Sequence, residues 1–325
     1  MSSEERETRV EATAAGVIAG IPVEAPHHQT PPDELVEDEE KKGGRQASLW
    51  TDAWRQLRRS PIFLISAGII ALMILIAAVP QLFTNADPRA CSLSNSLQRS
   101  SSGHIFGYDL QGCDYYARVL YGTRVSLSIG LIVTAGATVV ALVLGALAGY
   151  YGGLWDTLLA RIADIWFAIP FILAGIVFLS VLGEKGLAQV SFVLVVFGWP
   201  TMFRLLRSSI LSTKEMDYVR AARALGASDW RIIARHILPN AIAPVVVYAT
   251  ITIGIVIAAE ATLSFLGVGL QLPAISWGLM ISIAQNRILQ APHLLLFPGL
   301  FLSVTVLAFI MMGDALREAF DPKLH

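Results

Sequence analysis

The chain contains six long runs of residues without a charged side chain, and these runs constrain its fold more than any other feature. A hydrocarbon core about 30 Å thick is crossed by roughly 20 residues of α-helix, so each run is a candidate transmembrane helix. A hydrophobic fraction of 54% and a mean hydropathy of +0.60 agree with this assignment. We therefore expect an all-α, polytopic membrane protein with six transmembrane helices. The predicted spans are residues 62–83, 125–150, 165–182, 187–203, 241–259 and 294–313.

The first 47 residues differ sharply in composition from the rest. They are rich in Asp, Glu and Pro, and no aromatic residue occurs before Trp50. Such a segment cannot bury enough apolar surface to offset the entropy lost on ordering. We expect residues 1–60 to form a largely disordered cytoplasmic tail. A cleaved signal peptide is not expected, because the first long apolar run starts only near Pro61. A regulatory or partner-binding role for the tail is the alternative.

Basic residues predict which side of the membrane each loop occupies. An even number of spans places both termini on one side, and the more basic loops are expected in the cytoplasm. We therefore expect residues 61–325 to form the six-span domain, with cytoplasmic termini, an outer loop at 84–124 and a cytoplasmic loop at 213–239. The basic residues on the cytoplasmic side are Arg55, Arg58, Arg59, Arg204, Arg207, Lys214, Arg220, Arg223, Arg231, Arg235, Arg317 and Lys323. Those on the outer side are fewer: Arg89, Arg99, Arg118, Arg124, Lys185 and Arg287.

Cys91 and Cys113 are the two cysteines of the chain, and both fall in the expected outer loop. An oxidising compartment and the lack of competing thiols favour a disulfide between them. Two unpaired thiols are the alternative.

The cytoplasmic loop has the pattern of two short helices joined by a glycine. Asp217 can cap the first helix, Gly226 can supply the left-handed residue that ends it, and Ser228 can cap the second. Pro239 then prevents much continuation.

Small or apolar side chains stand beside arginines on both helices of this loop. This combination suits a compact knob that docks into a groove of another protein. A membrane-surface loop with positive-inside arginines explains the same pattern equally well. The side chains concerned are Ala221, Ala222, Leu225, Trp230, Ile233 and Ile237.

The spacing of Ala221-Ala222, Gly226 and the terminal Leu238-Pro239 is similar to that of the EAA loop in bacterial ABC importer permeases. The resemblance therefore favours the docking knob over the surface loop.

Two departures from the general pattern narrow this resemblance. Arg220 stands where the name of the loop places Glu, and His236 stands where an aliphatic residue is common. Both resemble the dipeptide, oligopeptide and nickel branch of these permeases. Three further stretches resemble the same branch, although Tyr108 and Cys113 replace the usual Thr and Arg in the first of them. These stretches are residues 106–127, 164–171 and 260–278, and the resemblance extends over about residues 50–325.

The resemblance implies that this chain is the second of two similar permease subunits in a type I ABC importer. Such an importer also contains two ABC ATPase subunits, separate or fused, and an external substrate-binding protein. ATP and Mg would be bound by the ATPases, and this chain would bind no cofactor. ATP binding would draw the coupling loops together and switch the pore between inward-facing and outward-facing states. The residues implied in ATPase coupling are Asp217, Arg220, Ala221, Ala222, Leu225, Gly226, Ser228, Trp230, Leu238 and Pro239.

Motifs of several other function classes are absent from the sequence. It contains no G-x-x-x-x-G-K-[ST], H-E-x-x-H, C-x-x-C or G-x-S-x-G, so neither an ATPase site nor another enzyme is indicated. A net charge of -1 offers no basic field for nucleic acid. Peptide is the favoured solute because the spans hold no His or Cys cluster for a metal path, and a nickel importer of the same branch is the alternative. An ion-coupled secondary transporter using Glu260, Asp164 and Arg161 and a non-transporting scaffold are the remaining alternatives.

Three charged side chains lie in or beside the predicted spans. Arg161 and Asp164, at the expected cytoplasmic start of the third span, can pair across one helical turn. A structural ion pair is favoured there over a role in transport. Glu260 follows Pro239 by about 20 residues, which places it roughly 30 Å from the cytoplasmic end of its span. For Glu260, a place in the pore or outer gate and a structural hydrogen bond at the following turn are equally favoured.

Overall fold

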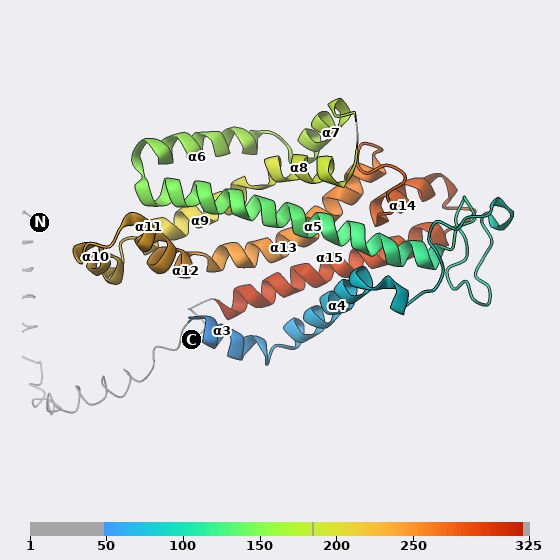
Figure 1. Cartoon of the computed structure of the whole chain (residues 1–325), viewed down its shortest axis with the longest axis horizontal. Coiled ribbons are helices and arrows are strands. Elements are labelled where there is room, and N and C mark those ends of the chain that lie inside the picture. The colour runs from blue at the N-terminus through green and yellow to red at the C-terminus, as the bar shows by residue number, and fades with distance from the viewer. Residues whose placement is uncertain (1–48, 184, 321–325) are drawn as a thin grey trace, which may run out of the picture. The chain divides into compact units, whose positions relative to one another are not determined.

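The computed structural model describes residues 49–183 and 185–320, and this part of the chain is helical, with no β-strand (Figure 1). The predicted all-α class is therefore confirmed, while residues 1–48 of the expected tail lie outside the described residues. The helices are α3 (Leu49–Leu57), α4 (Pro61–Ala78), α5 (Tyr115–Ala146), α6 (Gly153–Ala168), α7 (Phe171–Val181), α8 (Leu187–Gly198), α9 (Pro200–Thr213), α10 (Asp217–Ala224), α11 (Asp229–Arg231), α12 (Leu238–Ala241), α13 (Ala243–Phe265), α14 (Trp277–Ala284) and α15 (His293–Ala319). Short 3-10 or π turns are η1 (Pro80–Leu82), η2 (Leu93–Asn95), η3 (Leu147–Tyr151), η4 (Ile232–Ile237) and η5 (Gln285–Arg287).

Within the described chain, 4 helical segments are long and apolar enough to cross a membrane alone. They are α4, α5 continued by η3, α13 and α15. Two further pairs qualify when each is counted as one span: α6 with α7, bent by 84°, and α8 with α9, bent by 42°. The six predicted spans therefore correspond to single helices in four cases and to broken helices in two.

Proline explains both breaks. Pro170 follows Ile169, whose extended backbone (φ -93°, ψ 116°) ends α6, because a residue before proline disfavours the helical region. Pro200 is the first residue of α9. An N–H at this position has no hydrogen-bond partner within the helix, so proline is tolerated there. The predicted start of the third span at residue 165 is too late, since α6 begins at Gly153, and the chain turns at Pro170 before α7.

Helix α3 occupies the last part of the expected tail. Its side chains Ala53 and Leu57 are buried against α15. The ring of Trp50 lies edge-on to Phe320 at a centroid distance of 4.9 Å, and its Nε1–H donates to the carbonyl oxygen of Pro239 at 3.4 Å. The start of α3, the end of α15 and the end of loop 213–239 therefore lie together.

The transmembrane helices pack around α5 and α13. Helix α13 lies against α15 and α5, α4 lies against α15 and α5, and α9 lies against α5 (Figure 1). Gly145 of α5 and Gly149 of η3 lie where α9 packs closely. A Cβ on Gly145 would lie 3.0 Å from Leu206 Cδ2, and one on Gly149 would lie 2.8 Å from Ile210 Cγ2. Only hydrogen at these positions leaves room for α9.

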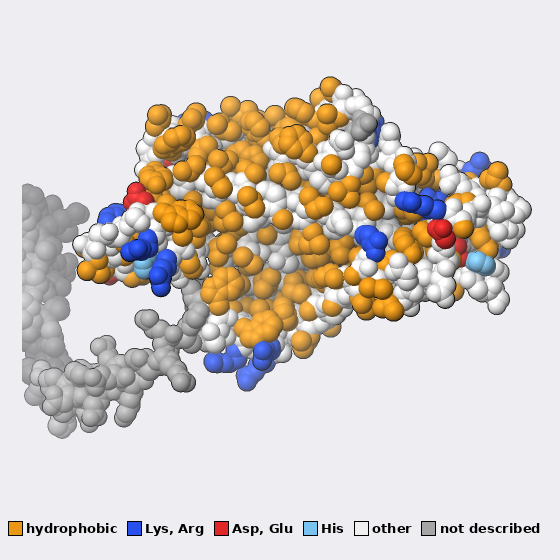
Figure 2. All heavy atoms as spheres, in the orientation of Figure 1, with side chains coloured by type: hydrophobic (Ala, Val, Ile, Leu, Met, Phe, Trp, Pro, Cys, Tyr) orange, Lys and Arg blue, Asp and Glu red, His pale blue; other side chains and the backbone are white. Residues whose placement is uncertain are grey.

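The two ends of the helical bundle carry different features. Helices α10, α11 and α12 lie at one end, and the loop that precedes α5 lies at the other (Figure 1). Between these ends, hydrophobic side chains cover most of the face shown in Figure 2, while Lys, Arg, Asp and Glu gather toward the two ends. This distribution fits helices that cross a bilayer and charged segments on both of its sides.

Candidate functional site

The first helix of loop 213–239 forms almost as expected. Helix α10 is preceded by Met216, whose backbone is extended (φ -68°, ψ 146°), so Met216 occupies the cap position. The prediction that Asp217 is the cap is wrong by one residue, because Asp217 begins the helix. Its carboxylate lies in the first turn, where the helix dipole still favours a negative charge.

Gly226 ends α10 in the left-handed region, with φ +79°. Its N–H donates to the carbonyl of Arg223 at 3.0 Å, and the N–H of Ala227 donates to the carbonyl of Ala222 at 3.1 Å. These two bonds form a Schellman motif, in which glycine avoids the clash that a Cβ causes at positive φ. The left-handed glycine predicted from the sequence is confirmed.

The second helix of the loop runs through a π turn to Ala241. Ser228 is at the cap position, but its hydroxyl makes no capping hydrogen bond within the described chain. Helix α11 passes into the π turn η4 and then into α12, which ends at Ala241, so the helix continues only two residues past Pro239, within the expectation that Pro239 prevents much continuation. The π turn brings the N–H of Leu238 to the carbonyl of Ile233, and Pro239 then falls in the first turn of α12, where its lack of an N–H is tolerated.

Two hydrophobic side chains of the loop project away from the chain. Leu225 is 88% exposed and Trp230 is 76% exposed, on either side of Gly226 in the sequence. We call Leu225, Gly226 and Trp230 the docking tip. Ile233 and Ile237, which were expected on the same surface, are instead buried inside the chain. An exposed leucine and tryptophan on a fixed turn suit insertion into an apolar groove.

The other residues expected in ATPase coupling lie on the same loop at different degrees of burial. Those with exposed side chains are Asp217, Arg220, Ala221, Ser228 and Pro239. Those that are partly buried are Ala222 and Leu238. Arg220 Nη2 pairs with Glu215 Oε2 at 3.0 Å. The loop therefore brings the predicted set together at one end of the bundle, with Ala222 and Leu238 turned partly inward.

Contacts with the end of the second span fix the position of this loop. The hydroxyl of Tyr150 donates to Asp229 Oδ1 at 2.6 Å, and the guanidinium of Arg223 lies 5.8 Å from the centroid of the Tyr150 ring. Lys214 Nζ donates to the carbonyl of Gly149 at 3.0 Å. Tyr150 was not among the residues predicted from the sequence to act with this loop. The sequence signal that could have indicated it is its position as the last residue of the predicted second span 125–150, on the same side of the membrane as loop 213–239.

Glu260 lies inside the protein and not on an exposed surface of the chain. It is 0% exposed on α13, and its Oε1 accepts hydrogen bonds from the hydroxyls of Ser264 at 2.7 Å and Ser276 at 3.1 Å. Each of these hydroxyls also accepts a backbone N–H, from Leu270 and Leu279 respectively. Glu260 thereby links the end of α13 to the start of α14. Of the two roles expected for Glu260, this arrangement favours a structural hydrogen bond over a place in the pore or outer gate.

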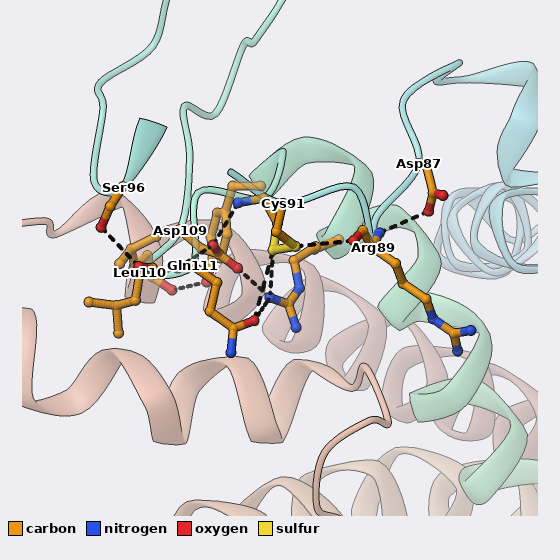
Figure 3. Close-up of polar contacts among 11 residues, drawn as sticks. Asp87, Arg89, Cys91, Ser96, Asp109, Leu110 and Gln111 are labelled. Atoms are coloured by element: carbon orange, nitrogen blue, oxygen red, sulfur yellow. Dashed lines mark hydrogen bonds and ion pairs between the residues drawn. A yellow bond between two sulfur atoms is a disulfide. The ribbon is translucent and has the colours of Figure 1, made fainter. Parts of the chain in front are cut away.

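The expected outer loop is closed by a disulfide. Helix α5 begins at Tyr115, about ten residues before the expected end of the loop at 124, because it extends beyond the apolar run. Cys91 and Cys113 are joined in a disulfide, and Figure 3 shows the polar contacts around it. Arg118 of α5 pairs with Asp109, and its Nη1 lies 3.4 Å from the Sγ of Cys113. These contacts hold the bridged segment against the first turn of α5.

Arg124 is the second arginine near the start of α5. Its Nε and Nη2 donate to the carbonyl oxygens of Ala77 and Ala78, at 2.8 and 2.9 Å. These carbonyls end α4, where the helix dipole is negative, so Arg124 caps that helix.

Two family models match the chain. Residues 141–325 match the family described as binding-protein-dependent transport system inner membrane component. Residues 48–99 match the N-terminal TM domain of oligopeptide transport permease C.

Several individual proteins are similar to this chain over most of their length. The dipeptide transport system permease protein DppC of Alkalihalophilus pseudofirmus is 40% identical over 277 residues, which cover 85% of this chain and 91% of that protein. The glutathione transport system permease protein GsiD of Pectobacterium atrosepticum is 38% identical over 276 residues, covering 85% and 91%. The oligopeptide transport system permease protein OppC of Bacillus subtilis is 36% identical over 288 residues, covering 89% and 94%.

Among solved structures, a chain of the MetNI methionine ABC transporter in inward-facing conformations aligns with a TM-score of 0.50 and 21% identity. The alignment covers 62% of this chain and 95% of that chain, and it concerns the fold alone. The family is shown by the match over residues 141–325 and by the identity and coverage of the relatives. This chain belongs to the binding-protein-dependent transport system inner membrane components, the membrane-spanning permeases of ABC importers.

Proposed function

We propose that this chain is a permease subunit of an ATP-driven peptide importer, in which it forms half of the translocation pore and couples to separate ATPase subunits. The docking tip carries this proposal. It presents Leu225, exposed on the Schellman turn, and Trp230, exposed on the following helix α11, within the segment that the family match covers. Exposed hydrophobic side chains on a turn that hydrogen bonds hold in place are suited to a protein partner.

The relatives favour peptide over nickel as the solute. Their names refer to dipeptide, glutathione and oligopeptide transport, and each similarity covers at least 85% of this chain. An external substrate-binding protein would deliver the peptide to the side of the outer loop, which the disulfide keeps compact.

The proposed assembly contains this chain, a similar second permease, two ATPase subunits or one fused ATPase, and the substrate-binding protein. The ATPases bind ATP and Mg, and this chain has no ATPase site of its own. The docking tip faces the cytoplasm together with both termini, in agreement with the excess of arginine on that side.

Reconstitution of the complete importer in proteoliposomes tests the proposal. ATP enclosed with the ATPases should drive uptake of a labelled dipeptide or oligopeptide only when the substrate-binding protein is supplied on the opposite side. Excess nickel should not compete with the peptide. Uptake that follows an ion gradient without ATP would show a secondary transporter and overturn the proposal. Uptake of nickel in place of peptide would overturn the choice of solute.

A further inference from the structure

Helices α6 and α9 both expose polar side chains. On α6, Thr157, Arg161 and Asp164 are exposed and follow one another at spacings of four and three, which places them on one face. On α9, the exposed residues include Arg204 and Ser208, again four apart. We call these five residues the polar stripe.

Another exposed face of α6 is apolar. Trp155, Leu158 and Ile165 are 56%, 50% and 58% exposed, at spacings that place them together on one side of the helix. Such a face suits contact with lipid tails. Helix α6 therefore has two exposed faces of different chemistry, and the polar one requires a different environment.

Two ion pairs join the charged members of the polar stripe. Asp164 Oδ1 lies 2.6 Å from Arg204 Nη2, and Asp164 Oδ2 lies 3.5 Å from Arg161 Nη1. The guanidinium of Arg204 also lies 3.9 Å from the centroid of the Phe167 ring. Side-chain exposure is 78% for Arg161, against 47% for Asp164 and 50% for Arg204. The cluster therefore has one positive charge in excess, and Arg161 is its most loosely held member.

Along α6, Arg161 and Asp164 lie between Leu158 and Ile165 of the apolar face. At about 1.5 Å per residue, Arg161 and Asp164 are roughly 12 and 16 Å from the start of α6 at Gly153. Arg204 is about 14 Å from the end of α9 at Thr213. The second ion pair between the helices, Asp156 to Arg207 with Oδ2 and Nη2 2.7 Å apart, keeps them in register. Charged side chains at the same level as exposed apolar residues are unfavourable against lipid and require water or protein.

We propose that the polar stripe lines the translocation path and that Arg161 binds the terminal carboxylate of a peptide as it passes, an inference that rests on the proposed peptide importer. A guanidinium pairs with a carboxylate through two parallel hydrogen bonds, which an ammonium or amide group does not reproduce. Arg204 is engaged by Asp164 and Phe167, whereas the more distant Arg161 can exchange Asp164 for the substrate. The excess positive charge complements the anionic end of any peptide with a free carboxyl terminus.

Cysteine labelling tests where the stripe lies, without requiring transport. Both native cysteines are in the disulfide, so the background is low. In the assembled importer, Thr157→Cys and Ser208→Cys should react with a charged thiol reagent that does not enter hydrocarbon, and Leu158→Cys and Ile165→Cys on the apolar face should not. If both stripe variants resist labelling in assembled complexes, the stripe is packed against the second permease and the proposal is wrong.

Substitution of Arg161 tests the contact with substrate. At saturating substrate-binding protein, Arg161→Gln should lower maximal peptide uptake severalfold while complex yield stays normal, and Arg161→Lys should restore part of it. Unchanged maximal uptake by Arg161→Gln would overturn the role of Arg161, and so would a fall that tracks a loss of complex. Absence of uptake by the unmodified importer would instead count against the proposed function, and the labelling would still report where the stripe lies.

Discussion

Substitution of Gly226 tests whether the turn at the docking tip governs coupling to the ATPases. At φ +79°, a residue with a Cβ meets its own carbonyl oxygen, which costs roughly 1–2 kcal/mol. No atom of the described residues lies within 4 Å of a Cβ built on Gly226, so the cost is confined to the backbone conformation. A cost of this size reduces the population of the correctly formed turn by a factor of roughly 5–30. We expect Gly226→Val to insert normally but to lose most uptake, and Gly226→Asn to retain most of it, because asparagine tolerates the left-handed region.

Two measurements decide this prediction: retention of the ATPases during purification and ATP-driven uptake in proteoliposomes. Gly68 on α4 is a matched control, since a Cβ built there also meets no described atom within 4 Å and its φ is not positive. Gly68→Val should therefore behave as the unmodified chain. Retention and uptake at normal levels for Gly226→Val would refute the docking assignment. A Gly226→Asn variant as defective as Gly226→Val would show that the backbone conformation is not the cause.

Three further predictions concern the docking tip, the outer loop and the interior. Trp230→Ala should weaken ATPase binding by about 2 kcal/mol or more, with little change in thermal stability because the side chain is 76% exposed; an unchanged affinity in a binding titration would contradict this. Peptide mapping without reductant should recover Cys91 linked to Cys113. Cys91→Ser should lower the free energy of unfolding by about 2–4 kcal/mol. Recovery of both residues as free thiols from native membranes would count against the bridge. Glu260→Ala leaves the hydroxyls of Ser264 and Ser276 without their acceptor and should cost about 1–3 kcal/mol and lower complex yield, whereas Glu260→Gln keeps an acceptor oxygen and should assemble normally. Equal yields would remove the structural role, and reduced uptake by Glu260→Gln at normal complex yield would favour a gate.

The spans could be predicted from the sequence because their signal is local. A charge-free run of about 20 residues has few alternatives to a membrane helix. Where each helix begins could not be predicted in the same way. Helix α5 begins at Tyr115 and α6 at Gly153, outside the apolar runs. The added turns contain charged side chains whose partners lie elsewhere in the chain, such as Asp109 for Arg118 and Arg207 for Asp156. Those pairings depend on the tertiary fold, which hydropathy does not report.

In loop 213–239 the local backbone conformation could be predicted, and the burial of side chains could not. The conformation of Gly226 was predictable because a left-handed helix end requires glycine whatever surrounds it. The burial of Ile237 was not, because it depends on a hydrophobic cluster that includes Ile210 of α9. Likewise, Arg161 and Asp164 were expected at the membrane interface because the apolar run begins only at residue 165. The predicted pair is present, with Arg161 Nη1 and Asp164 Oδ2 3.5 Å apart, but its place in the middle of α6 was not predictable, because that helix starts at Gly153.

Helix α9 connects the docking tip to the polar stripe. Val219 of α10 and Ile237 of η4 are fully buried and share one hydrophobic cluster with Ile210 of α9. Close-packed interiors resist deformation, so we expect a displacement of the tip to carry α9 with it instead of bending the junction between them. Arg204 lies on that helix, less than two turns above Ile210, and its ion pair extends the connection to Asp164 on α6. Closure of the proposed ATPases would therefore shift α9 and α6, which carry the two sides of the polar stripe, together.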